Sequence, residues 1–242
     1  MIGLAFALPL LFFWVRKMIP TDYHLKLLGL LLLGGLQGLM GWYMVKSGLV
    51  DQPAVSHFRL AAHLSLAFII FAALLLCGLS LIFKTRRFNN PAIHLHTLFS
   101  IACIGITIIW GAFTAGLDAG LVYNETFPQM GGQWIPPDFW KHESLWQNII
   151  ENHSAIQFTH RWLAIITVCV ILSLWLHAII KKNSFKALHA ACSMAFIQMG
   201  LGIGTLLSGV HVHVAASHQA GAVILLALLL ICLHQTRTQR CE

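Results

Sequence analysis

Seven stretches of the sequence are almost entirely apolar, and most are long enough to cross a membrane. In chain order they cover residues 2–15, 25–45, 60–83, 98–117, 158–180, 188–210 and 215–234. A helix needs about 20 apolar residues to span a bilayer, so the first stretch is too short by itself. Because lipid offers no partners to backbone polar groups, the pattern predicts an all-α integral membrane protein with seven apolar helices.

Composition and charge agree with a multi-pass membrane protein. Hydrophobic residues make up 58% of the chain and charged residues only 10%, against about 25% charged in soluble domains. The net charge of +7 does not suggest nucleic acid, because the basic residues form small clusters between the apolar stretches. The positive-inside rule places the C-terminus in the cytoplasm, and the expected location is a bacterial inner membrane rather than a mitochondrial one. The clusters that set this orientation are Arg16–Lys17, Lys26, Lys84, Arg86, Arg87, Lys181, Lys182, Lys186, Arg237 and Arg240.

One long connection, residues 118–156, lies on the outer side in this topology. It contains Pro128, Pro136 and Pro137, and three tryptophans that suit a membrane surface. Ser144 and Gln147 stand at capping-box spacing. We therefore expect a short helix that lies flat on the membrane surface within this loop.

An internal repeat divides the chain. Residues Gln37, Gly41, Ser47 and Gly48 match Gln198, Gly202, Ser208 and Gly209 at a spacing of 161, and His63 matches His218 at a spacing of 155. The repeat pairs the second stretch with the sixth and the third with the seventh, and the fourth has no partner. It predicts two tandem, pseudo-symmetric four-helix bundles: residues 1–90 would be an incomplete first bundle, and residues 91–242 a second bundle. A whole helix and the outer part of the first stretch are expected upstream of Met1.

Three of the fourteen histidines stand out. His63, His160 and His218 each lie within about two turns of the outer end of an apolar stretch, beside small residues. One such histidine alone is more often a core residue than a ligand, but His160 and His218 share one level. Two imidazoles that face each other inside a bundle can ligate a six-coordinate heme iron. The remaining histidines fit interfacial or loop positions, and the sequence does not show what accepts the second ring N–H of a ligand.

Charged residues near these histidines have two interpretations. Arg161 and Arg59 lie at the same level and could pair with heme propionates, or they could be interfacial anchors. Among the few carboxylates, Asp118 and Glu151 could orient a ligand or move a proton, although loop carboxylates are more often only solvated. No catalytic residue is assigned, and Glu151 is a weak candidate.

Several motifs resemble the heme A synthase family over essentially all 242 residues. The outer loop carries GLDAGLVYN at 116–124, FPQMGG at 127–132 and WIP at 134–136. The helix that follows carries Glu151 and QFTHR at 157–161. The other two histidine segments are SHFRLAAHL at 56–64 and SHQAG at 217–221.

The resemblance implies a function for both halves. The second half would hold a b-type heme between His160 and His218, with Arg161 beside it. The first half would bind the substrate, heme O, with His63 and Arg59 on that side. A ring methyl of heme O would be oxidised to a formyl group, which gives heme A for cytochrome oxidase, and the electrons would leave through the b heme. Implied partners are heme O synthase, the cytochrome oxidase assembly machinery and membrane lipid, and a homo-oligomer is possible.

The chain departs from the family pattern at its start. The family's first helix and first outer loop have no counterpart here, and that loop carries a glutamate thought to be catalytic and a histidine that faces the position of His63. A misassigned start codon, a fragmentary sequence or an inactive remnant would each explain this. The alternatives to an enzyme are a di-histidine membrane cytochrome that does not modify heme, and a seven-helix transporter with incidental histidines.

Overall fold

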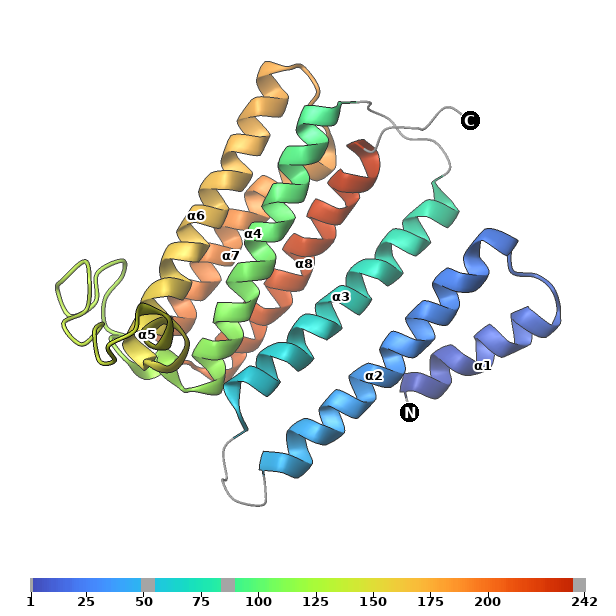
Figure 1. The fold of residues 1–242 in the computed structure, drawn as a ribbon. Helices are drawn as coiled ribbons and strands as arrows, with labels where there is room; N and C mark the ends of the chain where they lie inside the picture. Colours follow the sequence, from blue (N-terminus) through green and yellow to red (C-terminus); the bar gives the residue numbers. More distant parts are fainter. Residues whose placement is uncertain (1, 49–54, 84–89, 237–242) are drawn as a thin grey trace.

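A computed structural model describes residues 2–48, 55–83 and 90–236. The described elements are all helical (Figure 1). The α-helices are α1 (Ile2–Val15), α2 (His24–Gly48), α3 (His57–Ile82), α4 (Pro91–Gly116), α5 (Leu145–Glu151), α6 (His153–Ile180), α7 (Lys186–Leu207) and α8 (Val212–Thr236), and the 3-10 turns are η1 (Thr21–Tyr23) and η2 (Ala119–Leu121). The basic residues Lys84, Arg86, Arg87, Arg237 and Arg240, which helped to set the topology, lie outside the described residues.

All seven predicted apolar helices are present, but two begin at least five residues earlier than hydrophobicity suggested. Helix α4 begins at Pro91, where the Asn90 side chain accepts a hydrogen bond from the Ile93 N–H. Helix α6 begins at His153, where the Asn152 side chain accepts from the Ser154 N–H. These polar caps satisfy backbone donors that the helix leaves free, so each helix extends beyond its apolar stretch.

Four of the helices form a closed bundle (Figure 1). Helices α4 and α6, α6 and α7, α7 and α8, and α8 and α4 pack along shared seams, so α6 and α8 face each other across the bundle. The buried core of this bundle includes Ile171, Leu188 and Leu229. Helix α3 packs on α4 and α8, α2 on α3, and α1 on α2. The division of the chain into two tandem halves at residue 90 stays a prediction.

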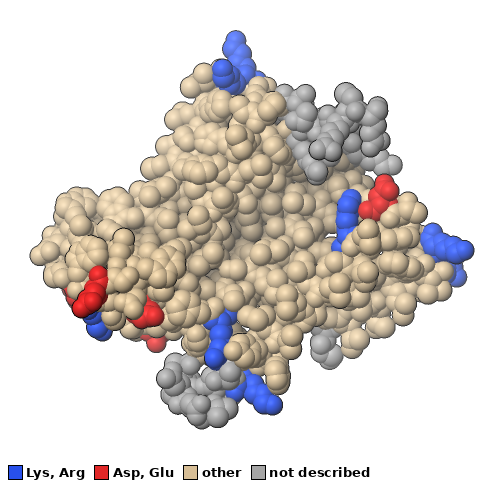
Figure 2. Space-filling view, in the orientation of Figure 1, with Lys and Arg blue, Asp and Glu red and all other residues tan. Residues whose placement is uncertain are grey.

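The surface of the bundle is that of a multi-pass membrane protein. Among the described residues, six helices are long and apolar enough to span a bilayer, and the segment Gly3–Val15 is apolar but shorter. Large apolar side chains are exposed along them, with Leu25 82% and Leu32 66% exposed. Figure 2 shows the charged side chains near the ends of the molecule, with a broad uncharged region between them on the face drawn.

The long connection between α4 and α6 is held together by Asn148 and by Asn152, whose side chain donates to the carbonyls of Asp138 and Phe139. The buried Asn148 side chain accepts from the N–H groups of Lys141 and His142 and donates to the carbonyls of His142 and Ser144. The expected surface helix is present as α5, with Ser144 at its N-cap, but the Ser144 side chain makes no capping hydrogen bond. The Asn148 amide instead holds the segment before α5, because it can both donate and accept.

A carboxylate ties the same connection to the start of α6. Asp138 accepts hydrogen bonds from the hydroxyls of Ser154 and Tyr123. Partial burial by itself would raise the pKa of Asp138, but these two hydrogen bonds favour the charged form and leave the pKa below its ordinary value. The same bond to Asp138 raises the pKa of the Tyr123 hydroxyl. The connection is therefore an ordered cap over one end of the bundle.

Candidate functional site

The three singled-out histidines lie at one depth below the same end of the molecule. His160 is the eighth residue of α6, and His218 and His63 are the seventh residues of α8 and α3. At a rise of about 1.5 Å per residue, each lies roughly 10 Å below the start of its helix. All three helices begin at the end of the molecule that carries the long connection (Figure 1). The sequence-based expectation of a shared level therefore has a structural counterpart.

The His160 ring is oriented by the backbone of α4. Its Nδ1 lies 3.1 Å from the Thr107 carbonyl oxygen. Because a carbonyl only accepts, Nδ1 must carry the proton, and Nε2 is left with the lone pair that a metal ligand needs. The Thr107 hydroxyl lies 2.8 Å from that of Thr167 and fixes α4 against α6. Thr107 is the acceptor that the sequence did not reveal.

A glutamine from the preceding helix holds His218. The Gln198 Nε2 donates to the His218 carbonyl at 2.9 Å and lies 3.2 Å from the His218 Nδ1. The repeat-related pair does the same in the first half: the Gln37 Nε2 donates to the His63 carbonyl at 3.2 Å and lies 3.3 Å from the His63 Nε2. The sequence repeat thus corresponds to a repeated contact, although it gave the glutamines no role.

Each of the three rings also packs against a glycine. A Cβ added at Gly111 would lie 3.0 Å from the Cε1 of His160, and one at Gly202 would lie 2.9 Å from that of His218. At Gly41 the corresponding distance to His63 is 3.2 Å. Real Cβ atoms seldom come so close, so these positions admit only glycine without moving the ring. The repeat had marked Gly41 and Gly202, but nothing in the sequence marked Gly111.

His160 and His218 are on the two helices that face each other across the bundle. Both rings are half-buried, and they lie within electrostatic range of each other. The Gln198 Oε1 beside His218 is buried without a hydrogen-bond partner. His218 leaves Nε2 free for a metal when the Gln198 amide is turned so that its Oε1, and not its Nε2, faces Nδ1–H. Two imidazoles oriented in this way on facing helices, each beside a glycine, can ligate one metal centre from opposite sides.

Arg161 anchors the long connection instead of extending to the surface. The residue is only 6% exposed. Its Nη1 donates to the carbonyls of Thr126 and Gln129 at 2.8 and 3.0 Å, and its Nη2 donates to the Tyr123 carbonyl at 2.6 Å and the Gln157 side chain at 3.0 Å. The Nε is buried without a partner. A contact of Arg161 with a propionate stays a prediction, but its main visible role is to hold residues 123–129 above His160.

The other candidate residues lie at the edges of this site. Arg59 is half-buried on α3, with its guanidinium 4.8 Å from the Tyr43 ring centre. Glu151 is exposed at the end of α5. The two carbonyls before it accept hydrogen bonds from other helices, Ile150 from the His57 Nε2 at 2.9 Å and Ile149 from the Trp110 Nε1 at 3.0 Å. Helix α5 is thereby fixed to both α3 and α4.

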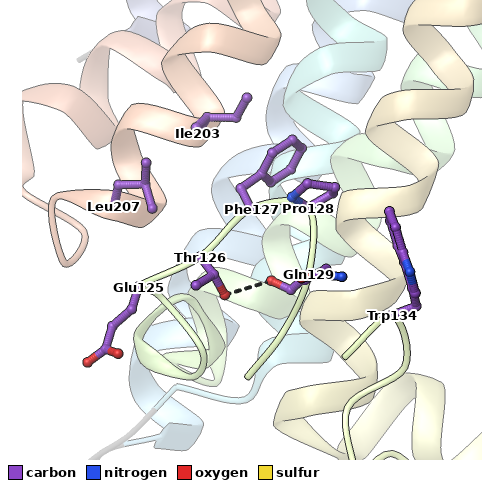
Figure 3. A pocket seen from close by; sticks show the side chains of 8 residues that line it. All are labelled: Glu125, Thr126, Phe127, Pro128, Gln129, Trp134, Ile203 and Leu207. Atoms are coloured by element: carbon purple, nitrogen blue, oxygen red, sulfur yellow. Dashed lines mark hydrogen bonds between the residues drawn. The ribbon is translucent and has the colours of Figure 1, made fainter. Parts of the chain in front are cut away.

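A cavity of about 500 Å³ opens between the long connection and the C-terminal end of α7 (Figure 3). Its walls are mostly apolar, with the Glu125 carboxylate at one side. Phe127, one of its lining residues, lies 5.9 Å from the Arg161 guanidinium, so the cavity adjoins the arginine anchor. The lining residues are Glu125, Thr126, Phe127, Pro128, Gln129, Trp134, Ile203 and Leu207.

Comparisons with a family model and with individual known proteins point to the same family. Residues 1–230 match the model of the COX15-CtaA family, described as cytochrome oxidase assembly protein. The heme A synthase of Rhodospirillum centenum is 45% identical over 242 residues, which cover 98% of this chain and 64% of that protein. The heme A synthase of Wolbachia pipientis from Culex pipiens is 42% identical, covering 98% and 71%. The bovine heme A synthase COX15 is 38% identical, covering 98% and 60%. The chain thus spans about two thirds of the length of these relatives.

Proposed function

Because the chain belongs to the COX15-CtaA family of cytochrome oxidase assembly proteins, we propose that it acts as a heme A synthase. In this proposal a ring methyl of heme O would be oxidised to a formyl group in the half that contains His63, and His160 and His218 would hold a b heme that would supply an electron carrier. The family match and the relatives at 38–45% identity support the reaction. The two oriented imidazoles support the heme site.

The residues around His160 and His218 fit a b heme. The Thr107 carbonyl holds the Nδ1 proton of His160 and so leaves the Nε2 lone pair free. Gly111 and Gly202 leave space for both rings to keep their orientation. When bound, a b heme supplies a one-electron carrier. The chain itself supplies the two ligands, their orientation and, through the Arg161-anchored connection, a cap that limits access of water from the outer side.

The first half would bind the substrate. His63 has the same depth, glutamine contact and glycine neighbour as His218, so it is positioned to approach the iron of heme O. Arg59, on the same helix one turn nearer the outer end, is placed to meet a propionate. Glu151 stays a weak candidate for a catalytic group, because it is exposed on α5.

The proposed location is a bacterial inner membrane, with the long connection outside and the C-terminus in the cytoplasm. Ten of the eleven basic residues that favour this orientation belong to clusters between or after the apolar stretches, as the positive-inside rule requires. Heme O synthase would supply the substrate, and the cytochrome oxidase assembly machinery would receive the product. Assembly into a homo-oligomer stays part of the proposal.

The proposal is tested by heme conversion. This full chain would be expressed in a bacterium that makes heme O but has no heme A synthase of its own. Hemes extracted from its membranes would be separated by liquid chromatography with mass detection. We expect heme A to form. A b-type spectrum in the purified protein without any heme A would instead support the di-histidine cytochrome. If both the heme A and the b-type spectrum are absent, both functions are rejected.

The glycine beside His218 provides a sharper test of the b-heme site. In Gly202→Val the new side chain would push the His218 ring from its position, and overpacking of this kind costs about 1–3 kcal/mol. We expect the heme b content per chain, measured by the pyridine hemochrome spectrum, to fall about tenfold. Gly200→Val is the matched control on the same helix, since a Cβ there meets nothing within 4 Å. Equal heme content in the two variants would contradict the proposed site.

A further inference from the structure

Two histidines face each other on the α4–α6 seam at the end opposite the long connection. The His96 Nδ1 lies 3.5 Å from the His177 Nδ1, and the ring centres are 5.8 Å apart. Both residues are half-buried. On α6, His177 follows His160 by 17 residues, which corresponds to about 25 Å along the helix. This pair is therefore separate from the proposed heme site, and it takes no part in the proposed function.

The His96 ring is oriented by a serine. The Ser173 hydroxyl donates its hydrogen to the Val170 carbonyl at 2.8 Å, so its oxygen is free to accept. The His96 Nε2 lies 3.1 Å from that oxygen and donates to it. The proton of neutral His96 is then on Nε2, and the Nδ1 lone pair points toward His177. Metal-binding histidines are oriented in this way by a partner on the other ring nitrogen.

The spacing of the two Nδ1 atoms fits a shared metal ion better than a strong hydrogen bond. A nitrogen–nitrogen hydrogen bond of 3.5 Å lies beyond the usual range of about 2.7–3.2 Å. Two Zn–N bonds of about 2.0–2.1 Å at a tetrahedral angle place the nitrogens about 3.4 Å apart. The two nitrogen atoms would need to move by only a few tenths of an ångström to bind the metal.

We propose that His96 and His177 form a site for a divalent transition-metal ion of the Zn²⁺ class. Each Nδ1 supplies one ligand, and the proton on the His177 Nδ1 moves to its own Nε2 when the metal binds. Within the described part of the chain, no cluster of three or more His, Cys, Asp or Glu residues is placed to hold a metal, so water completes the coordination. Imidazole pairs favour Zn²⁺, Cu²⁺ and Ni²⁺ over Mg²⁺ or Ca²⁺.

The neighbouring histidines differ from this pair in their contacts. The His189 Nδ1 accepts a hydrogen bond from the Trp175 Nε1 at 2.9 Å, and the His94 Nδ1 lies 3.2 Å from the Thr236 hydroxyl. His211 and His213, at the other end of the molecule, have ring centres 5.5 Å apart and are exposed. They make a suitable control, because they form a histidine pair without the serine that orients His96.

The test is a calorimetric titration of Zn²⁺ into the purified full chain in detergent, after treatment with a chelator. We expect the double variant His96→Gln/His177→Gln to bind one Zn²⁺ fewer per chain than the wild type, and each single variant to bind at this site at least about tenfold more weakly. His211→Gln/His213→Gln should retain the site. Co²⁺ in place of Zn²⁺ should give the visible absorption of a tetrahedral ion only in chains with both histidines.

Two results would overturn the proposal: unchanged Zn²⁺ stoichiometry in the His96→Gln/His177→Gln variant, or loss of that stoichiometry in the His211→Gln/His213→Gln control. If the double variant does not purify in folded form, the single His177→Gln variant is judged by the same criterion. In it His96 keeps its bond to Ser173, so the α4–α6 seam keeps that contact.

Discussion

Alanine in place of His160 or His218 is expected to abolish the low-spin b-type spectrum of the purified protein. Either change removes one of the two proposed iron ligands, and the other cannot hold a six-coordinate iron alone. Loss of a partner that only orients a ligand typically weakens metal binding by about 10- to 100-fold, so loss of the ligand itself should cost more. Heme per chain and the reduced-minus-oxidised spectrum measure the effect.

The matched control is His153→Ala. His153 is the first residue of α6, lies at the same end of the bundle and is exposed, so its loss should leave the spectrum unchanged. His63→Ala separates the two halves: it should keep the b-type spectrum and lose the conversion of heme O. A normal low-spin spectrum in either His160→Ala or His218→Ala would remove the basis of the proposed electron path.

The helices could be predicted from the sequence because lipid leaves the backbone few alternatives. Every apolar stretch had to form a helix, and each did. The helix ends were harder, because they depend on polar side chains. Asn90 and Asn152 extend α4 and α6 beyond the apolar residues, and a count of hydrophobic residues cannot include them. The capping bond expected of Ser144 does not form.

The site could be predicted from the sequence only in part, for a similar reason. Three histidines at one depth and their repeat were visible in the sequence, because they depend on residue type and spacing. The orientation of His160 was not, because its partner is the backbone carbonyl of Thr107, which every residue type possesses. Gly111 was also missed, since its helix has no partner in the repeat. His96 and His177 lie 81 positions apart, and only the packing of α4 on α6 shows that they meet.

Replacing Arg161 with methionine is expected to release the long connection from the bundle. The change keeps a long apolar side chain but leaves the carbonyls of Tyr123 and Thr126 without their donor, and the Gln129 carbonyl with only the Thr126 hydroxyl. Each buried acceptor that loses its partner costs about 1–3 kcal/mol. Water will reach some of these carbonyls, so we expect a net destabilisation of about 3 kcal/mol. Thermal unfolding in detergent and the rate of trypsin cleavage after Lys141 would both report it.

Two further variants decide what Arg161 does. Arg161→Lys keeps the charge but lacks the planar fork that reaches several carbonyls at once, so it should restore only part of the loop protection. Arg59→Met, at the same end of the molecule, should leave cleavage after Lys141 at the wild-type rate. If Arg161→Met instead lowers heme content while the cleavage rate and the unfolding temperature stay unchanged, the arginine acts on a propionate and the carbonyl contacts are incidental. Because the buried Nε is the one guanidinium nitrogen without a partner, a propionate contact that coexists with the anchor would have to be made there.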